Sequence, residues 1–150
     1  MHVQDIMTKN PACCTPATKL QDVARTMVEH DCGCVPVVES QETLKPVGVI
    51  TDRDITCRTV AQGKNPLEMT AGDCMSSPVM TVTPETSVED CCADMEQNQV
   101  RRVPVVDATG GCCGIVAQAD IAKAVPRQEM AKVVQEVSQP TDSPSRVGDK

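Results

Sequence analysis

Hydrophobic residues in the first half of the chain change their spacing along the sequence, which predicts a helix between strands. Between 20 and 28 they recur three or four residues apart, the spacing of an amphipathic helix. Two short apolar runs follow at 34–38 and 46–51, and the polar residues between them indicate a turn. A strand is expected near 12–15 before the helix, and a short helix near 52–62 after the last strand. The half-chain therefore predicts the order β-α-β-β-α.

The second half of the chain repeats this pattern. An offset of 68 residues places "VPVV" (35–38) opposite "VPVV" (103–106), and an offset of 66 then places "GVITDRDI" (48–55) opposite "GIVAQADI" (114–121). Two units of about 60 residues are each too small to be stable alone, so we expect them to share a core. The predicted fold class is α/β in the broad sense (α+β), with two tandem β-α-β-β-α repeats packed with pseudo-twofold symmetry. In the second half we expect strands at 79–83, 102–106 and 112–117, a longer helix from about 88, and a short helix at 118–125.

The repeat also predicts how the chain is divided. We expect repeat one at 1–62, a linker at 63–72, repeat two at 73–125, an amphipathic C-terminal helix at 126–139 and a disordered polar tail at 140–150. The longer helix of each repeat has a candidate capping box at its start. Thr18 with Gln21 provides it in repeat one, and Thr86 with Glu89 in repeat two.

Charge and composition exclude several classes of partner. The formal net charge is −7 and the chain has no aromatic residue, so neither phosphate attraction nor base stacking favours nucleic-acid binding. No apolar run approaches the roughly 18 residues that span a bilayer, so no membrane partner is expected. The N-terminus lacks the pattern of a signal peptide. We therefore expect a cytoplasmic location.

Ten cysteines are the most unusual feature of the composition. Most of them face a small apolar residue in the other repeat, as Cys14 faces Val82, and a buried cysteine packs like a small hydrophobe. There is no CxxC pair and there are only two histidines, which disfavours a structural zinc site. Packing is the favoured interpretation, and a metal or redox role stays open, most of all for Cys13 and Cys34.

Nothing in the sequence supports catalysis. It contains no phosphate-binding Walker loop, no G-x-S-x-G elbow and no H-E-x-x-H motif. We therefore expect that the protein is not an enzyme.

The doubled unit, with "GVITDRDI" in one copy and "QVRRVPVVD" in the other, resembles the CBS domain, the module named after cystathionine β-synthase. The resemblance covers roughly residues 1–125 and is to a stand-alone CBS pair. It implies a homodimer, and two clefts between the copies that bind an adenine ligand: AMP, ADP or ATP, with NAD or S-adenosylmethionine also possible. The family pattern of a binding half-site matches Gly48, Thr51 and Asp54, whereas the second copy has Ala117 in place of the hydroxyl.

The resemblance also suggests roles for individual side chains. Asp54 and Asp120 would accept hydrogen bonds from ribose hydroxyls. Thr51 would donate to a phosphate, which a nearby arginine would also bind. The remaining residues expected to line the clefts are Arg53, Arg101 and Arg102 for charge, and Val35, Val79, Val103 and Cys14 for the walls. We expect the cleft of Thr51 and Asp54 to bind a phosphorylated nucleotide more tightly than the cleft of Asp120.

Simpler interpretations compete with each of these roles. Thr51 is also a suitable helix N-cap, and both aspartates favourably meet the positive end of a helix. The arginines are equally compatible with solvated surface charge. At the level of the whole protein, three hypotheses remain: a nucleotide sensor acting on an unknown protein target, a cysteine-based metal or redox protein, and a structural dimerisation module with vestigial clefts.

Overall fold

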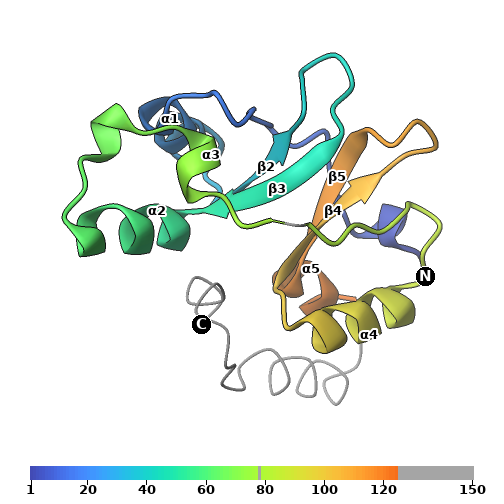
Figure 1. Ribbon diagram of the computed structural model, residues 1–150. Helices are drawn as coiled ribbons and strands as arrows, with labels where there is room; N and C mark the ends of the chain where they lie inside the picture. The colour runs from blue at the N-terminus through green and yellow to red at the C-terminus, as the bar shows by residue number, and fades with distance from the viewer. Residues whose placement is uncertain (78, 125–150) are drawn as a thin grey trace.

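The four strands predicted after the two long helices form at the predicted residues. The computed structural model describes residues 1–77 and 79–124, which form an α+β fold with two similar halves (Figure 1). The expected C-terminal helix at 126–139 and the tail at 140–150 lie outside the described residues. In chain order the elements are η1 (Val3–Asp5), β1 (Thr8–Lys9), α1 (Leu20–His30), β2 (Cys34–Val38), β3 (Pro46–Thr51), α2 (Asp52–Arg58), η2 (Val60–Gln62), η3 (Pro66–Glu68), α3 (Ala71–Cys74), α4 (Val88–Asn98), β4 (Arg102–Val106), β5 (Cys112–Ala117) and α5 (Gln118–Ala122).

Each half contains one antiparallel hairpin, and the two hairpins have the same register. In the first, Cys34 of β2 faces Thr51 of β3, and in the second, Arg102 of β4 faces Ala117 of β5. The strands expected near 12–15 and 79–83 are wrong in extent. Each is reduced to a single parallel bridge, Cys14 to Val37 and Val82 to Val105. Each of these segments follows a proline-containing stretch and makes only this one bridge with the hairpin.

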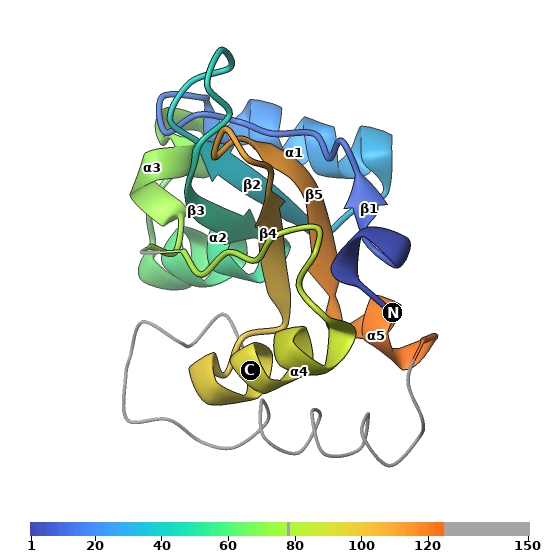
Figure 2. The ribbon, with the colours of Figure 1, turned by 90° about the vertical axis from the view of Figure 1, so that its right-hand side faces the viewer.

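A strand that the sequence did not predict lies next to β5. Thr8 and Lys9 of β1 pair antiparallel with Ile115 and Gly114, which extends the second hairpin to three strands (Figure 2). With only two residues, β1 is too short to show an alternating pattern. It matters because it holds residues 8–12 against the second half of the molecule.

The predicted capping boxes at the starts of the long helices are wrong. The Thr18 hydroxyl accepts instead from the Thr15 amide at 3.0 Å, and α1 begins after Lys19, whose side chain provides no cap. In the second half the Ser87 hydroxyl caps α4 by accepting from the Asp90 amide at 3.0 Å. The threonines expected as caps lie one residue too early, where they stabilise the preceding turn.

Two apolar cores form, one in each half, and each also contains a residue from the short helix at the start of the other half. Val3 of η1 is completely buried in the core of the second half, where its amide donates to the Thr86 carbonyl at 2.8 Å. Ala71 of α3 is likewise buried in the core of the first half, and its amide donates to the Thr18 carbonyl at 2.8 Å. The short helix at the start of each half therefore packs on the other half. In the described part of the chain, no helix has the length and apolar character needed to cross a bilayer.

Candidate functional site

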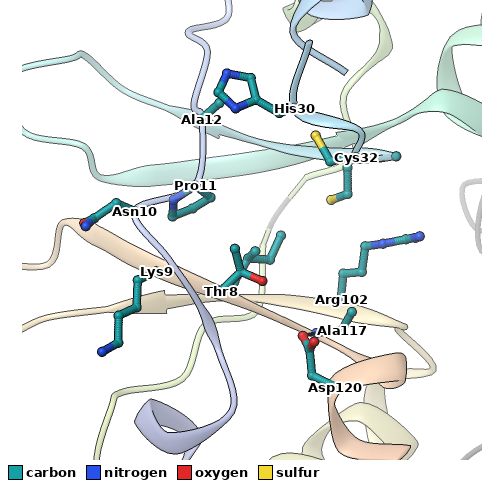
Figure 3. Close-up of a pocket in the computed structure, with 13 residues that line it drawn as sticks. Thr8, Lys9, Asn10, Pro11, Ala12, His30, Cys32, Arg102, Ala117 and Asp120 are labelled. Atoms are coloured by element: carbon teal, nitrogen blue, oxygen red, sulfur yellow. Dashed lines mark hydrogen bonds between the residues drawn. The ribbon is translucent and has the colours of Figure 1, made fainter. Parts of the chain in front are cut away.

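A pocket of about 330 Å³ lies where the two halves meet (Figure 3). One wall is residues 8–12, which we call the N-terminal strap. The opposite wall comes from the end of α1 and the start of β2, and β4, β5 and α5 complete the site. The residues outside the strap that line the pocket are His30, Cys32, Gly33, Cys34, Arg102, Ile115, Ala117 and Asp120. Cys34 and Arg102 occupy equivalent positions of the two repeats, so the pocket is formed close to the pseudo-twofold axis.

The pocket contains one carboxylate and two permanent cations. Lys9 comes from the N-terminal strap and Arg102 from the first residue of β4, whereas Asp120 lies in the first turn of α5. In Figure 3, Asp120 and Ala117 lie on one side of the pocket and His30 and Cys32 on the other. A half-buried carboxylate in a pocket that is also lined by two cations is suited to a ligand that offers both hydroxyls and negative charge.

Only part of the Asp120 carboxylate is used by the protein itself. Oδ2 accepts a hydrogen bond from the Ala117 amide at 2.8 Å, which holds the side chain over the start of α5. Oδ1 accepts no hydrogen bond from any residue that the structure describes. Because residue 117 is alanine, no hydroxyl competes for the space beside this carboxylate. The second oxygen is therefore available to a ligand.

In the first repeat, the equivalent aspartate, Asp54, is enclosed by other residues of the protein. Asp54 is only 3% exposed, and its Oδ2 accepts from the Thr51 amide at 3.0 Å while the Thr51 hydroxyl accepts from the Asp54 amide at 3.0 Å. Oδ1 lies 4.0 Å from the guanidinium of Arg58. Arg58 is itself held by the carbonyl oxygens of Cys74 and Met75, at 2.9 and 2.8 Å. Thr51 and Asp54 thus form the capping box of α2, the simpler of the two interpretations.

The different surroundings of Asp54 and Asp120 follow from two positions in the sequence. Thr51 corresponds to Ala117, and Arg58 corresponds to Ala124. The second repeat therefore lacks both the hydroxyl that caps its helix and the arginine that pairs with its aspartate. These replacements leave Asp120 half-buried, whereas Asp54 is enclosed.

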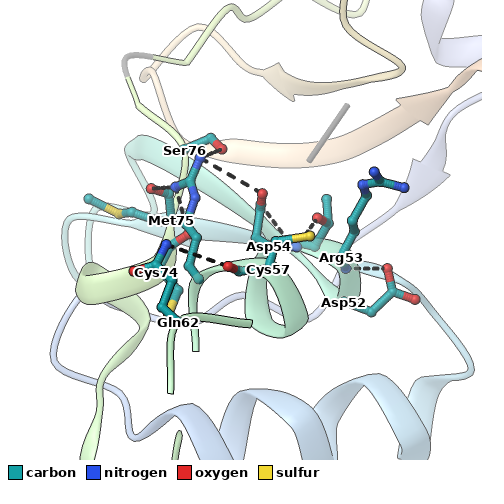
Figure 4. Close-up of polar contacts among 10 residues, drawn as sticks. Asp52, Arg53, Asp54, Cys57, Gln62, Cys74, Met75 and Ser76 are labelled. Atoms are coloured by element: carbon teal, nitrogen blue, oxygen red, sulfur yellow. Dashed lines mark hydrogen bonds and ion pairs between the residues drawn. The ribbon is translucent and has the colours of Figure 1, made fainter. Parts of the chain in front are cut away.

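Several predicted site residues do not line this pocket. Val35 and Val103 have no exposed surface and pack inside the two cores, so their side chains do not line this pocket, and their contact with a base stays a prediction. The Cys14 side chain is likewise buried, in the core of the first half, and does not line the pocket. Arg53 is exposed on α2 and extends away from Asp54 (Figure 4). Val79 is half-buried in the segment leading to α4.

Arg101 lies next to the pocket residue Arg102 and is half-buried. Its Nε is buried and has no hydrogen-bond partner among the residues that the structure describes, as is also true of Gln118 Nε2. The Gln118 amide donates to the Arg101 carbonyl at 2.9 Å, so the two residues are neighbours at the start of α5.

Sequence reasoning missed the N-terminal strap, His30 and Cys32. Lys9 reaches the pocket only because β1 pairs with β5, and a two-residue strand leaves no periodic signal. Comparison of the repeats gave no signal for the other two, because the residues equivalent to His30 and Cys32 are Asn98 and Val100.

Burial accounts for most of the cysteines. It raises the pKa of the Cys14 thiol to about 11 and the pKa values of Cys34 and Cys91 to about 12, so these thiols stay neutral and pack as small hydrophobes. Arg102 opposes this effect at Cys34 but does not reverse it. Within residues 1–77 and 79–124, no three histidine, cysteine or acidic side chains come together in an arrangement that could hold a metal ion.

Comparison with known proteins gives relatives that share this doubled unit. The CBS domain model matches residues 3–58 and 71–127. A CBS domain-containing protein of Bacillus subtilis, YhcV, is 41% identical over 80% of this chain and 82% of its own length. Hypoxic response protein 1 of Mycobacterium tuberculosis is 34% identical over 91% of this chain and 94% of its own length. MK0525 of Methanopyrus kandleri is 36% identical over 82% of this chain, but the match spans only 65% of its length.

Solved structures of similar proteins share the fold. Hypoxic Response Protein I with two coordinated zinc ions has a TM-score of 0.73 and 34% identity, covering 84% of this chain and all of that one. CBSX2 in complex with AMP has a TM-score of 0.69 and 27% identity, covering 82% and 94%. The CBS domain pair of MJ0100, in complex with 5′-methylthioadenosine and S-adenosyl-L-methionine, has a TM-score of 0.72 and 29% identity, covering 82% and 94%. The chain therefore belongs to the CBS domain family and contains two copies of the domain.

Proposed function

We propose that this protein is a regulatory, non-catalytic module that binds an adenine mononucleotide in the pocket between its two CBS repeats. The observation that supports it best is the half-buried Asp120 carboxylate, which has one oxygen available in a pocket that also contains Lys9 and Arg102. Two solved relatives, CBSX2 and MJ0100, contain adenosine ligands.

The pocket offers a partner for each part of such a ligand. The ribose hydroxyls donate to Asp120, and the phosphate accepts from Lys9 and Arg102. With no aromatic side chain in the sequence, the base lies on apolar surface from Ile115 and Pro11. A volume of about 330 Å³ is near the lower end of the range of roughly 300–1,000 Å³ for small-molecule sites. AMP is therefore favoured over ATP and over the dinucleotide NAD.

This proposal reverses the order of the two clefts expected from the sequence. Thr51 and Asp54 match the family pattern more completely, but their polar groups bond each other and Arg58. A ligand at that corner would have to displace an ion pair, whereas one at Asp120 finds an available oxygen. We therefore place the tighter site at Asp120.

Calorimetric titration with AMP tests the proposal, with ADP, ATP, NAD and S-adenosylmethionine compared under the same conditions. Replacing Asp120 with asparagine is expected to weaken AMP binding by about 10- to 100-fold, because hydrogen bonds to a charged group contribute about 1.5–3 kcal/mol. The matched variant Asp54→Asn should retain the affinity. If neither the native protein nor its variants bind any of these ligands, the vestigial-cleft hypothesis replaces this one.

A sensor acts by passing its signal to a partner. We propose that the protein acts as a homodimer on a separate protein target. Light scattering coupled to size exclusion, with and without AMP, measures the assembly state and any response to the ligand. A monomer under both conditions would contradict the homodimer.

A further inference from the structure

Two thiols from different repeats meet beside the N-terminal strap. Cys13 follows the strap directly and is half-buried, whereas Cys112 is the first residue of β5 and is buried. Their thiols are close enough to influence each other's ionisation, although they are 99 positions apart in the sequence. We propose that Cys13 and Cys112 form a redox site, in which a hydroperoxide converts the two thiols to a disulfide that joins the two repeats.

The backbone brings these residues together independently of the thiol contact. Lys9 faces Gly114 in the β1–β5 ladder, and the Asn10 amide continues that register by donating to the Cys113 carbonyl at 3.0 Å. The same register puts Cys112 opposite Pro11. The Cys13 thiol then turns back toward this position and donates to the Pro11 carbonyl at 3.3 Å. The path of the strap therefore places the Cys13 sulfur over the start of β5.

Hydrogen bonds from a third segment hold both cysteines in place. The Cys112 amide donates to the Leu44 carbonyl at 2.7 Å, and the Gln41 side chain donates to the Cys13 carbonyl at 3.4 Å. Both partners belong to the turn between β2 and β3. Because both backbones are anchored to one turn, closing a bond between the sulfurs requires rotation of side chains and little movement of the chain.

The two thiols have different chemical roles. The interaction between the two thiols lowers the pKa of Cys13 and raises the pKa of Cys112, whose own thiol donates to the Gly114 carbonyl at 3.4 Å. Burial raises the pKa of Cys14, the neighbour of Cys13, to about 11. A partly exposed thiol of lowered pKa next to a second thiol has the features of an oxidation-sensitive cysteine with a resolving partner. Cys13 is therefore the attacking thiol and Cys112 the resolving one.

The reaction balances with one molecule of hydroperoxide. The Cys13 thiolate attacks the O–O bond of hydrogen peroxide and forms a sulfenic acid, while the hydroxide that leaves takes up a proton and becomes water. The Cys112 sulfur then attacks the Cys13 sulfur, so that the S–S bond forms, the S–O bond breaks and a second water leaves with the Cys112 proton. The two thiols together lose two electrons and two protons.

Thiol counting on the full-length protein tests the proposal. The reduced chain has ten thiols, and brief treatment with hydrogen peroxide followed by denaturing alkylation should leave eight. Peptide mass spectrometry should locate the bond between Cys13 and Cys112. Cys13→Ala should abolish the paired loss, whereas the matched neighbours Cys14→Ala and Cys113→Ala should retain it. A bond between other cysteines, ten remaining thiols, or paired loss that persists in Cys13→Ala would overturn the proposal.

A second measurement separates a working pair from simple proximity. In the reduced protein, limited iodoacetamide at neutral pH should modify Cys13 first, and Cys112→Ala should slow that modification because the neighbouring thiol that lowers the pKa of Cys13 is lost. Peroxide should then drive Cys13 of Cys112→Ala to sulfinic acid, since no resolving thiol remains. If Cys112→Ala does not fold, the native protein and Cys13→Ala still decide the outcome. Unchanged alkylation and no overoxidation in a folded Cys112→Ala would refute the assigned roles.

Discussion

At the residue scale, the position four residues after each aspartate decides what the aspartate can do. Arg58 pairs with Asp54, is held by two carbonyl oxygens and is mostly buried. Arg58→Ala should therefore lower the free energy of unfolding by about 2–3 kcal/mol, because it removes the cation that pairs with a buried carboxylate and the donor to two carbonyls. Urea denaturation followed by circular dichroism measures this. The exposed pair of Arg25 and Asp22 is the control, and Arg25→Ala should change stability by less than about 1 kcal/mol.

The same position in the second repeat controls the proposed binding site. Ala124→Arg places a guanidinium four residues after Asp120, in the relationship that Arg58 has to Asp54. The new ion pair should compete with ribose hydroxyls and weaken AMP binding by about tenfold or more, measured by calorimetry. Ala122→Arg adds the same charge at the last residue of α5 without this spacing and should leave the affinity nearly unchanged. Equal losses in both variants would show that added charge, not pairing with Asp120, is responsible.

The sequence was sufficient to find the aspartates and Arg102 but not their environments. The repeat identified both carboxylates, because equivalent positions in two copies can be compared directly. It did not show which carboxylate is enclosed, since that depends on how Arg58 folds over the end of α3. Val35 and Val103 were placed on the cleft because they border it in sequence, yet alternate residues of a strand face opposite sides, and these two face the cores.

At the element scale, the short helices η1 and α3 each pack against the core of the other repeat. Val3 is fully buried in the second core although it starts the first repeat. Val3→Ala should reduce the free energy of unfolding by about 1–2 kcal/mol, because it removes two buried methyl groups and leaves a cavity. Val28 is 82% exposed on α1, so Val28→Ala serves as the control and should change stability by less than about 0.5 kcal/mol. A negligible effect of Val3→Ala would contradict the packing of Val3 in the core of the second half.

The two long helices differ in their N-cap residues, and substitutions at these two positions test the effect on stability. Ser87 caps α4, whereas Lys19, at the equivalent position before α1, provides no side-chain cap. Ser87→Ala should cost about 1 kcal/mol, and Lys19→Ser should stabilise the protein by up to a similar amount. Chemical denaturation of the two variants beside the native protein measures both effects. Loss of stability in Lys19→Ser would show that the lysine has a role that the helix start does not explain.

At the scale of the whole molecule, the repeat predicted the architecture because strands and helices depend on local patterns. The two hairpins and two long helices formed where apolar residues recur at the expected spacing. Features that depend on contacts between the halves were not predictable in this way. The β1–β5 pairing and the contact of Cys13 with Cys112 both join residues roughly a hundred positions apart, and no local pattern encodes them.

The buried thiols also make the stability of the whole molecule depend on pH. In the folded protein the pKa of Cys14 is raised to about 11 and the pKa values of Cys34 and Cys91 to about 12, whereas in the unfolded chain they return to about 9. A raised folded pKa means that the full stabilisation is present below pH 9 and is lost as the pH rises toward 12. Each thiol that ionises only in the unfolded state lowers stability by about 1.4 kcal/mol per pH unit in this window.

Urea denaturation at a series of pH values above 9, in the presence of a reductant, should therefore show a steep loss of stability. The chain has no tyrosine, so phenol ionisation does not contribute to the slope. Cys91→Ala should flatten the slope above pH 9, because it removes one of the thiols that ionise only on unfolding. Lysine ionisation affects the native protein and the variant alike, so the difference between their slopes isolates the thiol. Identical slopes would show that Cys91 ionises as readily in the folded protein as in the unfolded chain, which its complete burial argues against.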